Sequence, residues 1–171
     1  AIALVSDRDG MYRAHGNPVY DYLQIKGRLH KSSEDSRLYE RRDVRGTMKA
    51  LKAGRTVWYA PDQDYGIKQG VFAPFFGIHA ATVYATARLA EKTGALVVPF
   101  THVRLPSSQG YKICVHPALE NFPVGDDVVD ATRINRLVEQ FIRVQPDQYL
   151  WAHRRFKTRP AGEADFYTKI L

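Results

Sequence analysis

This chain of 171 residues has one cysteine and two methionines, and it has no apolar run long enough to span a bilayer. The single thiol, Cys114, excludes an intramolecular disulfide and any zinc site built from cysteines. It alternates with apolar residues in a short run, which indicates a structural thiol in a reducing compartment. No signal peptide is visible, and glycine-rich phosphate loops are missing as well.

Acidic residues are also in short supply, since 25 Lys and Arg stand against 18 Asp and Glu, a formal charge of +7. A basic balance indicates an anionic partner: nucleic acid, phospholipid headgroups, a phosphorylated ligand or an acidic protein. The patterns of nucleic-acid readers, such as RNP-like, helix-turn-helix or finger motifs, do not occur. Nucleic acid is therefore the least favoured of these partners.

Length and an apolar fraction of 44% predict one globular domain over residues 1–171. Strands alternate with helices, which predicts an α/β fold with a mixed β-sheet flanked by helices. The helices are predicted at 18–27, 42–53, 82–92, 129–144 and 148–153. The strands are predicted at 55–60, at 95–100 with an outward continuation over 102–104, and at 111–116, the last pairing back as a hairpin.

The stretch from Trp58 to Gly77, WYAPDQDYGIKQGVFAPFFG, places two carboxylates, Asp62 and Asp64, just beyond a predicted strand. Side chains at strand ends are where α/β proteins place binding and catalysis. These carboxylates could coordinate Mg²⁺, cap a helix, or fix an arginine or an acceptor hydroxyl. No third oxygen ligand is arranged nearby, so the sequence predicts neither a metal site nor a cofactor. The apolar block 71–76 lines an acyl or membrane-facing surface or packs in the core.

Among six histidines, His30 alone is followed by an acid at the fifth position, Asp35. Such a pair could act as a general base and its orienting carboxylate. It lies in a serine-rich loop without rigid support, however, and one chance match is what this composition predicts. We therefore interpret the pair as a coincidence.

Two further places offer cations to a ligand. Arg13 follows a predicted strand and precedes a Gly-Asn-Pro turn, so it faces either a site or solvent. The densest basic cluster is residues 153–157, HRRFK, which follows the aromatic residues Tyr149 and Trp151. Arginine suits phosphate binding because it presents a planar fork of donors. A solvated basic surface at a helix end is the alternative.

Four segments occur in order: MYRAHGNPVYDYLQIKGR, WYAPDQDYGIKQGVFAPFFG, LVVPF with Arg104 after it, and PDQYLWAHRRFKTRPAGEADFY. Together they resemble the C-terminal half of the late acyltransferases of lipid A biosynthesis. These enzymes are the lauroyl/myristoyl transferase family within the glycerolipid acyltransferase superfamily. The resemblance covers nearly the whole chain, and four ordered motifs are more specific than any one of them.

The resemblance implies an αβ fold and transfer of a fatty acyl chain from acyl carrier protein to a hydroxyl of a lipid A precursor. It implies the cytoplasmic face of a Gram-negative inner membrane as the setting, so the implied partners are the carrier protein, the lipid A precursor and the membrane surface. A basic surface would suit phosphorylated sugars and an acidic carrier protein alike.

The resemblance also assigns residues. Arg13 corresponds to an arginine thought to bind the acceptor or stabilise charge, and Asp62 falls where the superfamily's Pro-Glu-Gly motif has its acid. Here that motif is Pro61-Asp62-Gln63, so this chain departs from it by having Asp-Gln in place of Glu-Gly. The HRRFK residues would contact anionic headgroups. The predicted substrate-binding set is Arg13, Asp62, Asp64, Arg104, Arg154, Arg155 and Lys157.

The family's catalytic His-x4-Asp/Glu motif lies upstream of the segment matching YRAHGNP, and this chain begins too late to contain it. We therefore expect the catalytic pair upstream of Ala1 and no catalytic residue in this chain. The chain would then be a piece of a longer enzyme, without its membrane-anchoring N-terminus and without activity alone. The alternative from another functional class is a non-catalytic basic module that binds anionic lipid or nucleic acid.

Overall fold

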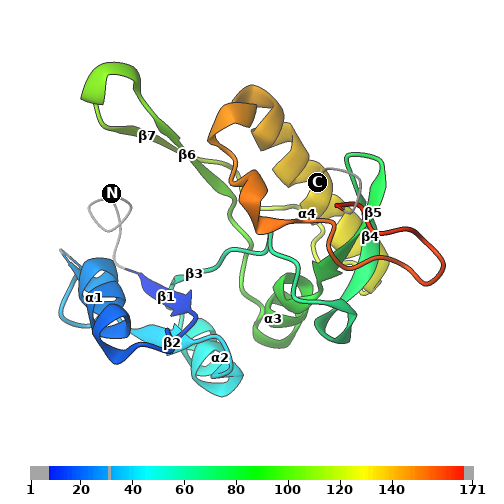
Figure 1. The fold of residues 1–171 in the computed structure, drawn as a ribbon. Helices are drawn as coiled ribbons and strands as arrows, with labels where there is room; N and C mark the ends of the chain where they lie inside the picture. The colour runs from blue at the N-terminus through cyan, green and yellow to red at the C-terminus, as the bar shows by residue number, and fades with distance from the viewer. Residues whose placement is uncertain (1–7, 31, 168–171) are drawn as a thin grey trace. The chain divides into compact units, whose positions relative to one another are not determined.

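The structure is a computed structural model that describes residues 8–30 and 32–167. It separates into two compact units (Figure 1). The first contains residues up to 59 together with 93–95, and the second contains 60–92 and the residues from 96 onward. Within the described residues, no helix is both long enough and apolar enough to cross a membrane.

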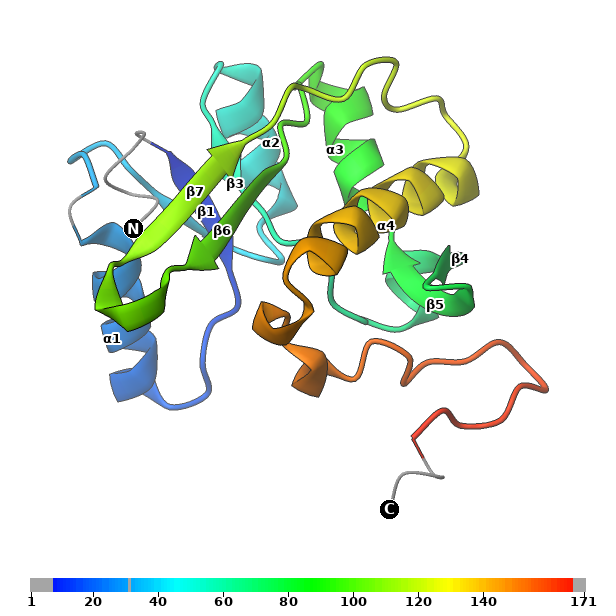
Figure 2. The same ribbon diagram turned by 90° about the horizontal axis from the view of Figure 1, so that it is seen from above.

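The first unit is built on a parallel sheet whose strand order is β2-β1-β3. Its strands are β1 (Asp9–Tyr12), β2 (Leu38–Glu40) and β3 (Val57–Trp58), joined by the helices α1 (Pro18–Leu29) and α2 (Val44–Lys52). The chain passes from β1 outward to β2 and then back across β1 to β3. Right-handed crossovers in opposite directions place the two helices on opposite faces of the sheet, and Figure 2 shows them on either side of β1.

Local signals start and stop these two helices. The Asn17 side chain caps α1 by accepting hydrogen bonds from the first-turn backbone, and Pro18 occupies the first helical position. Asp43 caps α2 by accepting a hydrogen bond from Gly46 N at 2.9 Å. Gly54, with φ of 76°, follows the end of α2. The predictions of helices in these two places are confirmed, with ends shifted by up to two residues.

The second unit contains two hairpins and two helices. Its elements are β4 (Gly70–Phe75), β5 (Ile78–Val83), α3 (Ala85–Thr93), β6 (Phe100–Arg104), β7 (Tyr111–Val115) and α4 (Asp127–Val144). β4 pairs with β5 and β6 pairs with β7, both antiparallel. The hairpin predicted for 111–116 and the long helix near 129–144 are confirmed. So is the α/β class, although the described strands form three small sheets.

The core of the second unit lies where α4 packs on β4. Phe75 is its largest fully buried apolar side chain, and its ring contacts those of Phe156 and Tyr149 at 5.8 and 6.5 Å between centroids. Ala80 and Ile142 complete the cluster. The apolar block 71–76 therefore supplies core residues, since Ala73 and Phe75 are buried.

Three predicted elements were wrong in type or extent. The helix expected over 82–92 starts only at Ala85 as α3, and Thr82 lies in β5 opposite Val71. The strand expected at 55–60 is confined to β3. The short helix expected at 148–153 is two 3₁₀ turns, Pro146–Gln148 and Trp151–His153.

The strand predicted at 95–100 is the fourth difference. β6 begins only at Phe100, and Leu96 is 77% exposed. Pro99 has no N–H to donate to a ladder, and its carbonyl accepts a single hydrogen bond from His116 N. An apolar run without a partner strand remains extended chain.

Candidate functional site

Arg13 lies directly beyond the carboxyl end of β1 and is exposed. Its carbonyl accepts a hydrogen bond from Gln24 Nε2 at 3.0 Å, which ties the turn after β1 to helix α1. The carboxyl ends of parallel strands are the edge at which open α/β sheets bind ligands. The guanidinium is therefore presented at the binding edge of the first unit. The other predicted site residues belong to the second unit.

Asp64 is in the interior, with 3% of its surface exposed. It accepts hydrogen bonds from Gly66 N at 2.8 Å, from Thr158 N at 2.8 Å and from Thr158 Oγ1 at 2.9 Å. The carboxylate therefore ties the loop after β3 to a segment 94 residues later in the chain. Its oxygens are occupied by the chain itself.

The five residues of the HRRFK cluster differ in burial, and His153 at its start is exposed. Arg155 and Phe156 are buried, at 2% and 6% exposure, whereas Arg154 and Lys157 are exposed. Arg154 has a left-handed backbone, with φ of 49°, and its guanidinium lies 5.6 Å from the centre of the Tyr167 ring. Two of the cluster's three Arg and Lys side chains are therefore available to a ligand.

The Arg155 guanidinium joins a buried polar network. It donates to the Ala81 carbonyl at 2.6 Å, to Thr82 Oγ1 at 2.9 Å and to Asn135 Oδ1 at 3.2 Å. It also lies over the Phe75 ring at 5.1 Å. Asn135 Nδ2 in turn donates to the Pro74 carbonyl and to Thr82 Oγ1, both at 2.9 Å. The network links both strands of the β4–β5 hairpin to α4 and to the HRRFK segment.

Asp62 is half-buried and lies in the electrostatic environment of both Tyr149 and Arg155. Burial, and secondarily the charge of Asp62, raises the pKa of Tyr149 to about 12. Burial lowers the pKa of Arg155, and nearby Tyr149, Asp64 and Asp62 oppose that shift. The charge of Asp62 therefore acts on one hydroxyl and one guanidinium, and its role in substrate binding stays a prediction.

Two buried polar atoms of Tyr149 and Arg155, the side chains whose pKa the charge of Asp62 affects, have no hydrogen-bond partner among the described residues. Tyr149 Oη and Arg155 Nε are both buried from solvent and make no hydrogen bond within residues 8–30 and 32–167. Buried donors almost always find a partner in native proteins. The second unit therefore has unused hydrogen-bonding capacity at Tyr149 and Arg155.

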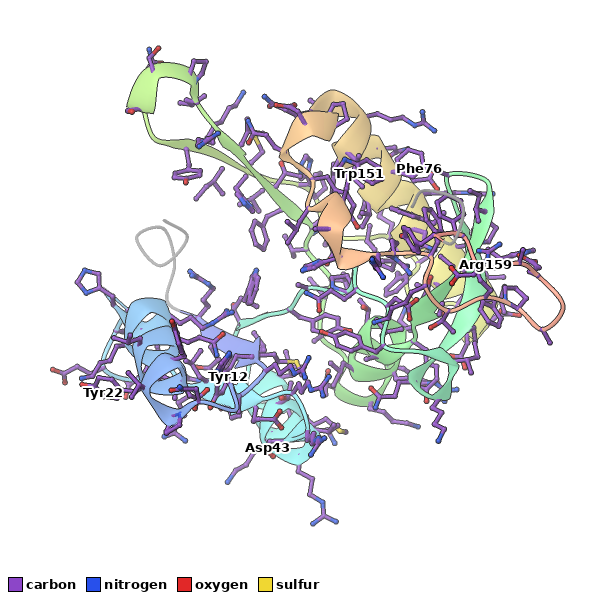
Figure 3. The ribbon with its side chains drawn as sticks, in the orientation of Figure 1. Tyr12, Tyr22, Asp43, Phe76, Trp151 and Arg159 are labelled. Carbon is purple, nitrogen blue, oxygen red and sulfur yellow. The ribbon has the colours of Figure 1, made fainter. Side chains whose placement is uncertain are left out.

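Arg104 ends β6 and is exposed. Its backbone N–H donates to Gln148 Oε1 at 2.8 Å, and its carbonyl accepts from Gln148 Nε2 at 3.0 Å. These two bonds hold the 3₁₀ turn that precedes Trp151. Trp151 lies beside Phe76, with 6.1 Å between ring centroids (Figure 3), and Arg143 lies over Phe76 at 4.9 Å. An aromatic and cationic surface results at this end of α4.

His30 and Asp35 do not form a catalytic pair. His30 is an exposed residue at the end of α1, and Asp35 is exposed in the following turn. In the part of the chain that the structure describes, no hydrogen bond joins their side chains, and the Asp35 carbonyl accepts from Arg55 instead. Nor do His, Cys, Asp and Glu side chains among the described residues gather in threes that could hold a metal ion.

The catalytic pair expected upstream of Ala1 is not tested by the structure. Ala1 itself lies outside the described residues, which start at residue 8. The placement of the histidine–acid pair before this chain therefore stays a prediction that follows from the resemblance. What the described residues do show is that His30 and Asp35 cannot replace that pair.

Sequence reasoning missed Asp9, the buried anion of the first unit. It is 1% exposed and accepts two hydrogen bonds of 2.6 Å from Arg55, with further bonds from Arg37 N and Tyr39 Oη. An aspartate inside a strand is unusual, and that was the available signal. Thr82 and Asn135 gave no such signal, because each reads as an ordinary strand or helix residue.

Comparison with known proteins gives consistent results over most of the chain. Residues 6–158 match the model of the family described as bacterial lipid A biosynthesis acyltransferase. A lipid A biosynthesis lauroyltransferase of Escherichia coli strain K12 is 43% identical over 159 residues, covering 92% of this chain and 51% of that protein.

Two further relatives come from the same strain. A palmitoleoyltransferase is 41% identical over 157 residues, covering 91% of this chain and 50% of its own length. A myristoyltransferase is 31% identical over 165 residues, covering 93% and 49%. The chain thus spans about half the length of the curated relatives it matches.

Proposed function

This chain belongs to the bacterial lipid A biosynthesis acyltransferase family, and we propose that the whole protein transfers a fatty acyl chain from acyl carrier protein to a hydroxyl of a lipid A precursor. The observation that carries the proposal is the continuous family match over residues 6–158. The reaction would take place at the cytoplasmic face of the inner membrane.

Acyl transfer from a thioester to a hydroxyl needs a base for the hydroxyl and donors for the tetrahedral oxyanion. Arg13 supports the second requirement, because it is an exposed cation at the carboxyl edge of a parallel sheet. We assign it to acceptor binding or to stabilising the developing negative charge. The resemblance assigns the base to a histidine–acid pair, for which His30 and Asp35 do not qualify.

Asp62 is assigned to the acceptor side of the reaction. The charge of its carboxylate acts on the buried Tyr149 hydroxyl and on the Arg155 guanidinium, each of which has an atom without a hydrogen-bond partner among the described residues. A carboxylate there accepts a hydrogen bond from an acceptor hydroxyl or orders the cations around it. Asp64 and Arg155 are committed to hydrogen bonds within the chain, so we assign them to holding this site in place.

The exposed cations Arg104, Arg154 and Lys157 are assigned to the anionic parts of the acceptor. Guanidinium and ammonium groups neutralise sugar phosphates, and arginine can bind them through two parallel hydrogen bonds. Arg104 and Arg154 flank the 3₁₀ turns that carry Trp151. A lipid acceptor with a phosphorylated headgroup and apolar chains suits cations next to exposed aromatic residues.

Acyl transfer by the full-length protein tests the proposal. Acylated carrier protein serves as donor and a lipid A precursor as acceptor, with the 171-residue chain assayed in parallel. We expect transfer by the full-length protein and none by the 171-residue chain alone. If the full-length protein shows no transfer but binds anionic lipid or nucleic acid tightly, the protein is a non-catalytic binding module.

Two substitutions in the full-length protein test the assigned roles. Asp62→Ala should lower kcat/KM for the acceptor by at least tenfold, and a wild-type value would refute the role of Asp62. Arg154→Gln combined with Lys157→Gln should raise the acceptor KM several-fold at an unchanged melting temperature. An unchanged KM would make these two cations part of an ordinary solvated surface.

A further inference from the structure

Helix α2 carries a row of cations along one side. Arg45, Lys49 and Lys52 lie on the helix, and Arg42 precedes its capping residue, so the intervals are three, four and three residues. Residues at these intervals lie on the same face of a helix. All four residues are exposed. We call Arg42, Arg45, Lys49 and Lys52 the cationic row.

The cationic row is not explained by contacts inside the chain. Among the described residues, none of its four side chains takes part in an ion pair or a side-chain hydrogen bond. Helix stability accounts for Lys49 and Lys52, which lie in the last turn where cations interact favourably with the helix dipole, but it does not account for Arg45. The first turn of a helix favours acidic side chains, yet α2 has none there and has Arg45 instead.

The opposite side of α2 fixes how the helix sits in the first unit. Thr47 is fully buried and Ala50 is 4% exposed, and the helix contacts β3. A helix that binds a bilayer must turn its apolar face into the lipid. The small residues on the inner face of α2 are already buried against the first unit. The buried inner face of α2 is therefore not free to insert into a bilayer.

The charge of the molecule is concentrated in the same unit. Residues 1–59 contain twelve Lys and Arg against seven Asp and Glu, whereas residues 60–171 contain thirteen against eleven. A local excess of positive charge raises the association rate of an anionic partner. The first unit thus combines an excess of positive charge with an ordered, unpaired row of cations.

We infer that the cationic row is the docking surface for an acidic carrier protein that presents the acyl donor, an inference that rests on the proposed function. A row of cations at one-turn spacing complements a partner helix whose carboxylates repeat at three and four residues. Val44 is 49% exposed beside the row and offers an apolar contact at its start. Charge complementarity sets the partner and its orientation, and the phosphates of a bilayer offer no such fixed spacing.

Direct binding tests the inference with acylated acyl carrier protein as the probe. One variant of the full-length protein combines Arg45→Gln, Lys49→Gln and Lys52→Gln. A matched control combines Lys92→Gln, Lys112→Gln and Arg136→Gln, three exposed cations elsewhere with the same change in charge. We expect the Kd for the carrier to rise about tenfold in the row variant and less than twofold in the control. Equal losses, or no loss in the row variant, would overturn the inference.

Reversal of charge on both partners provides a second readout. A charge-reversal variant, which combines Arg45→Glu, Lys49→Glu and Lys52→Glu, should bind the carrier weakly. Carrier variants with lysine in place of surface carboxylates should restore the binding. Circular dichroism confirms that the helix content is retained. If no carrier variant restores the affinity of the folded charge-reversal variant, carboxylates of the carrier are not the partners of the cationic row.

Kinetics separate this inference from the proposed function. With acylated carrier protein as donor, the row variant should show a raised donor KM at an unchanged kcat. With acyl-pantetheine, an uncharged donor without the protein, it should match the wild type. If the wild type transfers no acyl group from either donor, the proposed function fails, whereas an active row variant with a normal donor KM overturns the docking surface alone.

Discussion

Arg155 shows how one buried cation can hold several segments together. Its guanidinium fork reaches the Ala81 carbonyl, Thr82 Oγ1 and Asn135 Oδ1 at the same time. A lysine ammonium is a point charge and cannot reproduce that planar geometry. Arg155→Lys should therefore lower the free energy of unfolding by about 2–4 kcal/mol, because buried acceptors lose their donors. Urea titration followed by circular dichroism measures it.

The neighbouring residue supplies the control for this prediction. Arg154 is exposed, so Arg154→Lys should change the free energy of unfolding by less than about 0.5 kcal/mol. Equal effects of the two substitutions would mean that the hydrogen bonds of Arg155 do not stabilise the fold. Because both variants replace an arginine by a lysine, a difference in their unfolding free energies comes from the position of the residue and not from the type of substitution.

Asp9 predicts how stability depends on pH. Burial raises its pKa. Hydrogen bonds from Arg55 and from the backbone of Arg37 together lower the pKa by more than burial raises it, so the pKa lies below the ordinary value. A depressed pKa contributes stability that is complete above the unfolded value of roughly 4 and is lost as pH falls through the folded value. Asp9→Asn should cost about 2 kcal/mol at pH 7.

The gap in unfolding free energy between wild type and Asp9→Asn should narrow as the pH falls below roughly 4, because Asp9 of the unfolded chain then binds a proton while the native carboxylate is still ionised. Unfolding free energies at pH 7 and pH 3 give the two values. Glu34→Gln, at an exposed position, serves as the comparison. A gap that stays constant between the two pH values would contradict the role of the ionised carboxylate.

For single residues, the sequence identifies the candidate site residues, but it does not tell which of their side chains are buried and which are exposed. Arg154 and Arg155 are adjacent and identical, and only one is buried. What decides between them is the position of Thr82 and Asn135, which lie 73 and 20 residues away in the chain. Asp64 is similar, because its partner Thr158 lies 94 residues away. Long-range partners of this kind leave no local pattern.

Among the elements, helices were predicted better than strands for a physical reason. The start of α4 is encoded by Asp126, whose side chain accepts hydrogen bonds from the first turn, so its position follows from neighbouring residues. A strand also needs a partner. β5 was missed because Thr82 resembles a helix cap, although its place opposite Val71 is fixed by pairing with β4.

The β4–β5 hairpin depends on a glycine at its open end. A Cβ atom at Gly70 would lie 2.2 Å from the Thr82 carbonyl oxygen, which is backbone and cannot move aside. Gly70→Ala should therefore separate the strands locally and lower the free energy of unfolding by about 1–3 kcal/mol. Chemical denaturation and amide exchange of the hairpin measure the effect. An unchanged exchange rate at Thr82 would contradict the close contact.

Gly27 supplies a control of opposite sign. It lies within helix α1, and nothing lies within 4 Å of a Cβ added there. Gly27→Ala should increase the free energy of unfolding by about 0.5–1 kcal/mol, because alanine loses less conformational freedom in a helix. If both substitutions destabilised the chain alike, a general intolerance of alanine would explain the result better than the contact at Gly70.

For the whole molecule, the family could be predicted from the sequence, whereas the location of its charge could not. The four ordered motifs extend from residue 11 to residue 167, so the resemblance did not depend on correct strand assignments. Net charge likewise indicated an anionic partner of any kind. Choosing a surface required knowing that Arg45 and Lys49 lie on an exposed helix face without ion pairs.

Attraction to a membrane should follow total charge, whereas docking of a carrier protein should follow the cationic row. Each cation near an anionic surface contributes about 1 kcal/mol whichever element carries it. The row variant and its matched control each lower the formal charge from +7 to +4. Both variants of the 171-residue chain should therefore lose affinity for phosphatidylglycerol-containing vesicles to a similar extent.

Sedimentation with vesicles at low and at physiological salt measures this attraction. Vesicles of phosphatidylcholine alone should retain little of either variant or of the wild type. At physiological salt the Debye length is about 8 Å, so binding to the anionic vesicles should weaken for all three proteins together. A selective loss in the row variant would make the cationic row a membrane-binding surface, because a charge sum cannot distinguish two variants with the same net charge.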